Sequence, residues 1–271
     1  MRAKARHCIE PALHGKPGEA AKESWGSGAA YELWVGRWSR SVAREFIDWL
    51  AVAPGQTWGD VGCGTGALAE CILGGSAPAA VLAVDRSEAY VRAARASIGD
   101  TRARFEVGDA CALAWATGDC DATVSGLVLN FVADPDAMAG EMARVTRPGG
   151  RVAAYVWDYA GGMQMIRHFW DVAIELNRGD SKLDQAERFP LCQSEPLEQL
   201  IRRAGLISVS VCLIDVPTAW AGLGRDGKTL CRGAPSWRQI VGLSLSSPWR
   251  LQPADPTVPV SFLETSYARN P

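Results

Sequence analysis

Histidine is scarce in this chain, which has three histidines (His7, His14 and His168) among its 271 residues. Its eight cysteines include no Cys-x-x-Cys pair. A zinc site of the usual Cys/His type therefore has few ligands to draw on. We expect no metal site, and we expect the cysteines to be reduced and structural, because a free thiol in an apolar context behaves as a small hydrophobic group.

The chain also lacks an excess of charge of either sign, with 28 Lys+Arg against 30 Asp+Glu and a formal net charge of −2. Proteins that bind nucleic acid through its phosphates are normally strongly basic, so that class is disfavoured. No apolar run approaches the roughly 18 residues of a membrane helix. No apolar segment follows the basic residues near the N-terminus, so a secretory signal is not expected. We therefore expect a soluble, cytoplasmic protein that does not enter a membrane.

The sequence divides into three regions of different pattern. Residues 1–24 show no hydrophobic periodicity, and we expect a loose N-terminal arm there. Residues 25–216 show regular alternation and should hold the folded domain. Seven of the 15 prolines fall within residues 217–271, where we find no clean strand before Val258–Leu263. We expect an atypical proline-rich tail in that region, and the position of the last strand of the fold is left open.

Short apolar strands alternate with helical segments within residues 25–216. The strands are continuously apolar, which is typical of parallel strands covered on both faces. We therefore expect an α/β fold with a doubly wound, mostly parallel sheet. The expected strands are Thr57–Val61, Ala80–Val84, Arg104–Val107, Ala122–Leu129, Arg151–Trp157 and Ser208–Val216. The expected helices are an amphipathic one through Trp38 and Phe46, then Ala67–Leu73, Ser87–Ile98, Asp134–Val145, Met163–Leu176 and Pro196–Ala204.

A glycine-rich loop, with Gly62, Gly64 and Gly66, follows the first strand and opens a helix. Without Cβ atoms, these residues let the backbone turn tightly and approach a ligand beside a helix N-terminus. The loop is a weak signal by itself. The spacing Gly62-x-Gly64-x-x-Ala67 also satisfies the dinucleotide-binding pattern, so a nicotinamide-dependent oxidoreductase is an alternative.

Three acidic residues strengthen the prediction of a ligand site. Asp60 lies just before the glycine loop, Asp85 ends the second strand and Asp109 follows the third. Ligands of open α/β sheets bind outside the carboxyl ends of the strands, so the sheet should bring these carboxylates to one edge. A carboxylate after the second strand can accept both hydroxyls of a ribose, and one after the third can accept from the amino group of adenine.

Four stretches resemble, in order and spacing, the successive motifs of class I S-adenosylmethionine-dependent methyltransferases. The stretches are Trp58-Gly59-Asp60-Val61-Gly62-Cys63-Gly64-Thr65-Gly66, Val84-Asp85-Arg86-Ser87, Gly108-Asp109-Ala110 and Arg147-Pro148-Gly149-Gly150. The likeness is greatest to the small-molecule group that includes quinone-biosynthesis enzymes, and it covers about residues 30–216. The segment from Tyr31 to Arg40 is similar to one that many members carry before the first strand, where it helps to close the cofactor pocket.

The resemblance implies that S-adenosylmethionine is the cofactor and assigns its contacts. The glycine loop would line the methionine half, Asp85 would hold the ribose, and Asp109 with Ala110 would hold the adenine. Leu127, after the fourth strand, would border the sulfonium. The full set of expected cofactor residues is Tyr31, Trp38, Asp60, Gly62, Cys63, Gly64, Gly66, Asp85, Arg86, Asp109, Ala110 and Leu127.

The activity that the resemblance implies is methyl transfer to a small organic acceptor by in-line displacement. Such a reaction depends mainly on positioning, so no catalytic dyad is required. His168 is the best single candidate for a general base, although a lone histidine beside Phe169 and Trp170 is more often a packing residue. A non-catalytic module that binds the cofactor or a partner protein is the second alternative. The identity of the acceptor and the oligomeric state are left open.

Overall fold

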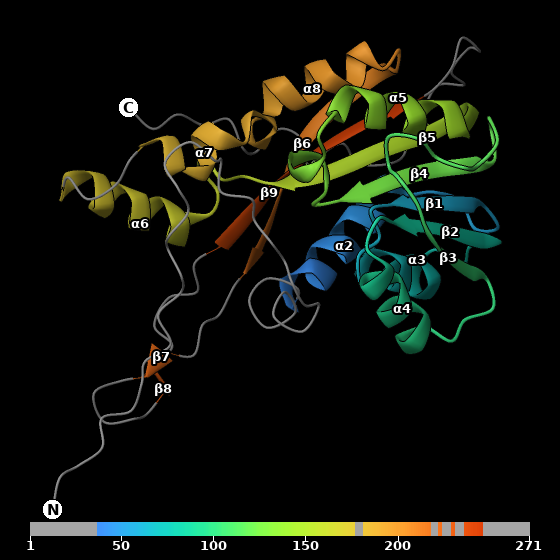
Figure 1. Ribbon diagram of the computed structural model, residues 1–271, viewed down its shortest axis with the longest axis horizontal. Helices are drawn as coiled ribbons and strands as arrows, with labels where there is room; N and C mark the ends of the chain where they lie inside the picture. Colours follow the sequence, from blue (N-terminus) through green and yellow to red (C-terminus); the bar gives the residue numbers. More distant parts are fainter. Residues whose placement is uncertain (1–36, 177–180, 218–221, 224–228, 231–235, 246–271) are drawn as a thin grey trace, which may run out of the picture.

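The computed structural model of the protein describes residues 37–176, 181–217, 222–223, 229–230 and 236–245. A seven-stranded sheet with the strand order β3-β2-β1-β4-β5-β9-β6 forms the centre of this part of the chain (Figure 1). The strands of this sheet are β1 (Thr57–Val61), β2 (Ala80–Asp85), β3 (Ala103–Val107), β4 (Cys120–Gly126), β5 (Thr146–Trp157), β6 (Ile207–Pro217) and β9 (Ser236–Leu245). Two short strands, β7 (Gly222–Leu223) and β8 (Thr229–Leu230), pair separately.

The first five strands are mutually parallel, whereas β9 runs antiparallel to both of its neighbours, β5 and β6. The doubly wound, mostly parallel α/β fold expected from the sequence is therefore confirmed. Parallel neighbours need a crossover, and α3, α4 and α5 supply it between β1 and β2, β2 and β3, and β4 and β5. The helices of the described residues are α2 (Arg37–Leu50), α3 (Ala67–Gly75), α4 (Glu88–Ser97), α5 (Pro135–Val145), α6 (Gln164–Glu175), α7 (Gln185–Arg188) and α8 (Ser194–Arg203).

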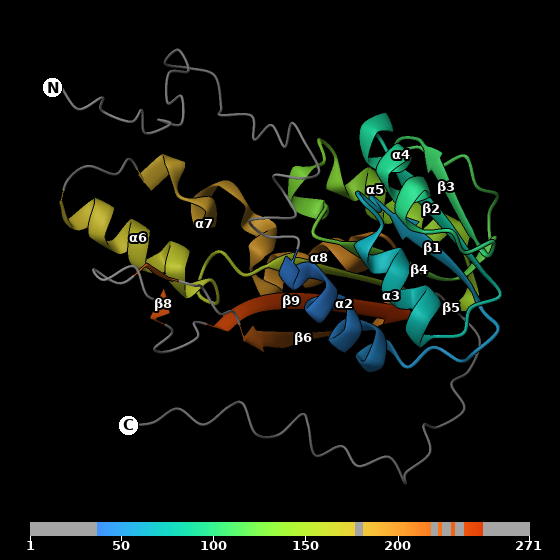
Figure 2. The same ribbon diagram turned by 90° about the horizontal axis from the view of Figure 1, so that it is seen from below.

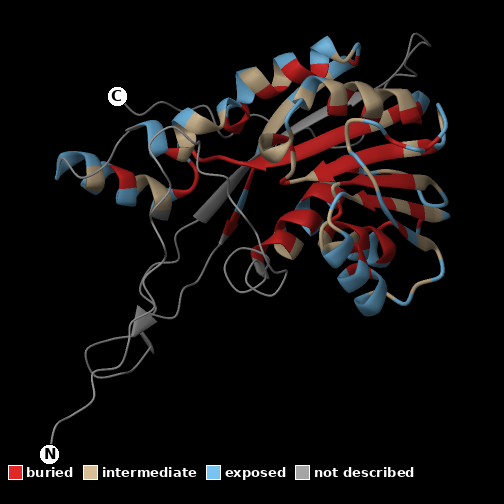
Figure 3. Ribbon diagram, in the orientation of Figure 1, coloured by how far each residue is buried: buried red, intermediate tan, exposed pale blue. Residues whose placement is uncertain are grey.

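Helices cover the sheet on both faces, with α2, α3 and α4 on one side and α5 and α8 on the other (Figures 1 and 2). On the first face, Phe46 of α2 and Trp58 of β1 belong to one buried cluster. On the second face, Met142 of α5 and Leu197 of α8 pack in another cluster with Val152 of β5. The central strands are buried along their length, as Figure 3 shows, which explains why their sequences are apolar without alternation.

Capping residues begin two of the helices where the sequence predicts. The Ser87 hydroxyl accepts a hydrogen bond from Tyr90 N–H at 3.4 Å and starts α4. The Asp134 carboxylate accepts one from Ala137 N–H at 2.9 Å and starts α5, with proline in the first turn. Such caps satisfy N–H groups that have no partner within the helix. The fourth strand is shorter than expected, because β4 ends at Gly126 and a 3₁₀ turn occupies Leu129–Phe131.

Strand β9 is the largest departure from the sequence expectation. It lies within the region that we expected to be an atypical tail, and it pairs with β6 from Ser236 to Leu245 and with β5 from Gln239 to Leu245. The expectation that no clean strand precedes Val258–Leu263 is therefore wrong, and the sheet extends beyond residue 216. A strand inserted between two others is held by backbone hydrogen bonds on both edges, and these leave no mark on hydrophobic periodicity. Val258–Leu263 and the arm 1–24 lie outside the described residues.

Candidate functional site

The carboxyl ends of β1 and β2 meet at the glycine loop. The N–H groups of Gly62 and Cys63 both donate to the carbonyl of Val84, at 2.8 and 2.9 Å, so the loop is attached to the end of β2. Three loop glycines have positive φ angles, with Gly62 at +80°, Gly64 at +55° and Gly66 at +91°. Residues with a Cβ rarely adopt this left-handed region, so the loop conformation requires glycine.

The surroundings of the three glycines differ. A Cβ on Gly62 would lie 2.4 Å from a methyl group of Val128, and one on Gly66 would lie 2.6 Å from Ile98. A Cβ on Gly64 would meet no atom within 4 Å. Gly62 and Gly66 therefore allow close packing of neighbouring side chains. Gly64 faces open space, in which a ligand can approach the backbone.

Asp85 connects the end of β2 to this loop. One of its carboxylate oxygens accepts a hydrogen bond from Gly64 N–H at 3.0 Å, and the other accepts from Ser87 N–H at 2.8 Å. Each oxygen keeps a second lone pair, because an ionised carboxylate offers about four acceptor positions. The side chain is thus held in place by the backbone and can still accept two ligand hydroxyls.

Asp60 is the most unusual group at this edge. Its side chain is 1% exposed, and neither carboxylate oxygen has a hydrogen-bond partner of normal geometry. Burial, together with the neighbouring Asp85, raises the pKa of Asp60 to about 7, and the backbone N–H of Ala69 in the first turn of α3 offsets part of this shift. A buried carboxylate without a partner is costly, so this group is suited to a cationic or hydrogen-bonding ligand.

Asp109 follows β3 at the same edge. The N–H of Gly108 donates to the backbone carbonyl of Asp85 at 3.1 Å, so the ends of β2 and β3 are adjacent. The Asp109 carboxylate accepts from Cys111 N–H at 2.9 Å and is exposed, while Ala110 is half-buried. Asp60, Asp85 and Asp109 thus lie at the carboxyl ends of three neighbouring strands, and Asp85 also bonds the glycine loop.

Leu127 stands where the chain leaves β4. Its φ angle is +64°, and its N–H donates to the carbonyl of Tyr155 at 2.8 Å. A leucine in the left-handed region costs about 1 kcal/mol or more, and such strain persists where the surroundings enforce it. The following residue, Val128, is the one that lies against Gly62. The segment after β4 is therefore placed firmly against the glycine loop.

For the remaining expected site residues that it describes, the structure gives burial or position on an element. Trp38 is buried in the first turn of α2, Cys63 is buried within the loop, and Arg86 is exposed. Tyr31 lies outside the described residues. His168 is exposed on α6, which lies beyond the end of β5 and apart from the glycine loop in Figures 1 and 2.

The structure also brings together an aromatic group that sequence reasoning missed. Phe131, after β4, and Tyr159, after β5, both contact the ring of Phe189, with ring centroids 5.3 and 5.5 Å apart. The guanidinium of Arg188 lies 5.1 Å from the Phe189 ring centroid. Beside Phe131, the side-chain oxygen of Asn130 is buried without a hydrogen-bond partner in the described structure. The three aromatic residues lie far apart along the chain, so the sequence gives no signal that their rings are in contact.

Metal ligands do not gather in the described part of the chain, where no three His, Cys, Asp or Glu side chains form a group that could hold an ion. The six cysteines in that part are free thiols. None of its helices has the length and apolar content that crossing a bilayer requires.

Residues 59–154 match the family model described as a methyltransferase domain. The chain is 39% identical over 111 residues to the ubiquinone/menaquinone biosynthesis C-methyltransferase UbiE of Dinoroseobacter shibae. This alignment covers 39% of the chain and 44% of the relative. It is 30% identical over 172 residues to the 2-methyl-6-phytyl-1,4-hydroquinone methyltransferase of Synechocystis, covering 62% of this chain and 52% of that protein. The chain thus spans about half the length of these relatives.

A solved structure shows the same fold at low sequence identity. Phosphoethanolamine N-methyltransferase 2 of Haemonchus contortus, solved with phosphomonomethylethanolamine and S-adenosylhomocysteine, superposes with a TM-score of 0.54 at 14% identity. The superposition covers 78% of this chain and 53% of that one.

Proposed function

We propose that the chain uses S-adenosylmethionine to methylate a small organic acceptor, a proposal that the match of residues 59–154 to a methyltransferase domain supports. The observation that carries the proposal is the edge at the carboxyl ends of β1, β2 and β3, where Asp85 bonds the N–H of Gly64, whose Cβ position is open, and where Asp60 and Asp109 also lie. When bound, the cofactor supplies a methyl group that its positively charged sulfur already activates.

The residues at this edge fit the parts of that cofactor. Asp60 provides a buried carboxylate without a partner, which an α-ammonium group would satisfy. Asp85, held by two backbone N–H groups, has acceptor positions left for two ribose hydroxyls. Asp109, exposed after β3 and next to Ala110, would accept from an exocyclic amino group of adenine. These contacts orient the cofactor, and orientation supplies most of the catalysis in such a transfer.

For the acceptor, we propose a compound with an aromatic ring, such as a hydroquinone or phenol. Two relatives are named as quinone or hydroquinone methyltransferases. In this chain, the rings of Phe131 and Tyr159 both contact Phe189 past the ends of β4 and β5, and a flat aromatic ring could join this group by stacking. The buried oxygen of Asn130 is suited to accept a hydrogen bond from a ring hydroxyl.

Isothermal titration with S-adenosylhomocysteine tests the cofactor part of the proposal. We expect the wild-type protein to bind, and Asp85→Asn to bind at least about tenfold more weakly, because charge-assisted hydrogen bonds to the ribose are lost. Asp100→Asn is the matched control, since Asp100 lies at the opposite end of β3 and pairs with Arg102 at 2.7 Å. Binding of NADH in place of S-adenosylhomocysteine would support the oxidoreductase alternative and refute the proposal.

Turnover assays separate an enzyme from a non-catalytic module. We expect methyl transfer from radiolabelled S-adenosylmethionine to hydroquinones or phenols. Cofactor binding without transfer to any acceptor of a broad panel would favour the non-catalytic alternative. His168 stays a predicted general base for acceptors that must lose a proton, and a loss of kcat in His168→Ala with unchanged cofactor affinity would support that role.

A further inference from the structure

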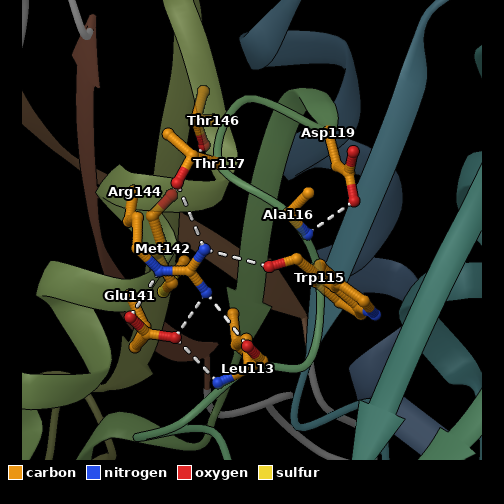
Figure 4. A network of polar contacts seen from close by, with 9 residues as sticks. All are labelled: Leu113, Trp115, Ala116, Thr117, Asp119, Glu141, Met142, Arg144 and Thr146. Carbon is orange, nitrogen blue, oxygen red and sulfur yellow. Dashed lines mark hydrogen bonds and ion pairs between the residues drawn. The ribbon is translucent and has the colours of Figure 1, made fainter.

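The loop between β3 and β4, residues 108–119, carries Asp109 and Ala110. Apart from an isolated bridge between Asp109 and Ala112, this loop has no regular secondary structure to fix its shape. Side chains of α5 hold it instead, as Figure 4 shows. Gly108 N–H bonds the Asp85 carbonyl just before Asp109, and α5 holds the part of the loop that follows Asp109.

Two residues of α5, Glu141 and Arg144, make these contacts. The Glu141 carboxylate accepts a hydrogen bond from Leu113 N–H at 2.8 Å. The Arg144 guanidinium donates to the carbonyl of Leu113 at 3.0 Å and to the carbonyl of Trp115 at 2.9 Å. The two side chains also pair with each other through two contacts of 2.7 Å (Figure 4). One ion pair thus binds the N–H and the C=O of Leu113 and the C=O of Trp115.

The environment of the pair shields these contacts partly from water. The side chains of Arg144 and Glu141 are 33% and 21% exposed, so water competes only partly for their hydrogen bonds. The Arg144 hydrogen bonds hold the pKa of Glu141 below its usual range and keep it charged. The ring of Trp115 packs against β1, where a Cβ on Gly59 would lie 2.9 Å from it. The loop is therefore bonded to side chains of α5 on one side, and its Trp115 ring packs against β1 on the other.

We propose that the Glu141–Arg144 pair is a positioning device for the adenine site, and that it sets the selectivity of the protein for the adenine base. This inference rests on the proposed function, because it assumes that Asp109 faces an adenine amino group. The pair itself contacts the backbone of Leu113 and Trp115, four and six residues beyond Asp109, and Arg144 also donates to the Thr117 hydroxyl at 3.5 Å. Loss of the pair should free the loop and move the Asp109 carboxylate out of hydrogen-bonding range.

The test compares two ligands rather than one. S-adenosylhomocysteine is titrated beside its analogue whose adenine 6-amino group is replaced by hydrogen, so that the ratio of the two dissociation constants isolates the amino-group contact. We expect the wild-type ratio to be about 10- to 100-fold, as for a hydrogen bond to a charged group. In Arg144→Gln we expect the affinity for S-adenosylhomocysteine to fall about tenfold or more, while the analogue is nearly unaffected.

Control variants separate positioning from stability. Arg203→Gln removes another ion pair of the same helix, between Arg203 and Asp136 at 2.7 Å, and touches no part of the 108–119 loop. We expect it to leave the ratio unchanged. Asp109→Ala should abolish the ratio, and adding Arg144→Gln to it should cause no further loss. Arg144→Lys keeps the charge but not the two-pronged contact, so it should fold and give an intermediate ratio.

An equal loss of affinity for both ligands in Arg144→Gln, with the ratio preserved, would overturn the inference and leave Arg144 a purely structural residue. A wild-type protein that binds both ligands equally would overturn it as well. A wild-type protein that binds neither ligand would instead refute the proposed function on which the inference rests.

Discussion

Replacing the buried carboxyl of Asp60 by an amide should stabilise the protein while removing its ligand contact. The carboxyl is 1% exposed, and burial raises its pKa from 3.8 to about 7. In the unfolded chain the group ionises near pH 3.8, so between that pH and 7 the folded state holds a proton that the unfolded state has lost. The stability contributed by this group therefore falls as the pH rises through this window.

The magnitude follows from the shift of about three pKa units, which corresponds to about 4 kcal/mol when the pH exceeds both values. Between pH 5.5 and 8.5 the free energy of unfolding of the wild-type protein should fall by about 2 kcal/mol. The fall takes place between pH 5.5 and about 7, because the carboxyl is ionised in both states at higher pH. Asp60→Asn cannot ionise and should not show this loss. Its free energy of unfolding, measured by urea denaturation, should therefore gain about 2 kcal/mol on that of the wild type over this pH range.

Asp121→Asn is the matched control with the opposite sign. Burial alone would raise the pKa of Asp121, but hydrogen bonds from Thr57 N–H, at 2.7 Å, and from Arg147 lower it below its usual value. Its stabilising effect is thus complete above pH 5.5, and Asp121→Asn should destabilise by the same amount at pH 5.5 and 8.5. If the advantage of Asp60→Asn does not grow with pH, Asp60 is not a buried, neutral carboxyl, and the reasoning about its ligand fails.

Further predictions concern the loop, the cofactor and the acceptor. Gly62→Ala should destabilise by about 1–3 kcal/mol in urea denaturation, because its Cβ meets Val128 at 2.4 Å and φ is +80°. Gly64→Ala should lower the free energy of unfolding by about 1 kcal/mol but weaken S-adenosylhomocysteine binding more than Gly62→Ala does, since of these two Cβ atoms only that of residue 64 enters open space. Equal effects of the two substitutions on binding would refute this difference between the two glycines. The dissociation constant for S-adenosylhomocysteine should fall by about tenfold per pH unit up to about pH 7 and level off above it, as Asp60 ionises to meet the ligand ammonium, and a flat calorimetric profile would contradict this. Phe189→Ala should raise the KM for an aromatic acceptor several-fold with cofactor affinity unchanged, and an unchanged KM would place the acceptor elsewhere.

The parts of the fold that follow local rules could be predicted from the sequence. The starts of the helices at Ser87 and Asp134, the glycine loop and the three strand-end acids are local signals, and the structure has them at the positions that the sequence indicates. The expected fourth strand runs to Leu129, whereas β4 ends at Gly126, and the positive φ angle of Leu127 arises from tertiary contacts that no window of sequence reveals.

The parts set by long-range pairing could not be predicted. Strand β9 is defined by its neighbours in the sheet, and Phe189 meets Phe131 only because the 3₁₀ segments after β4 and before α8 come together. The Glu141–Arg144 pair lies within an ordinary amphipathic helix, where an acid and a base three residues apart indicate a surface ion pair rather than a contact with a distant loop.

The antiparallel position of β9 has a consequence for synthesis of the chain on the ribosome. Strand β6 leaves the ribosome before β9, yet its partner in the sheet is β9, which pairs residues 207–217 with residues 236–245. Until residue 245 has emerged, β5 and β6 each present an unpaired backbone edge, which favours association with other nascent chains. The parallel half of the sheet, whose strands are complete by residue 157, can form before that point. Premature termination after residue 217 should therefore yield a chain with an assembled cofactor edge that aggregates through its open strands.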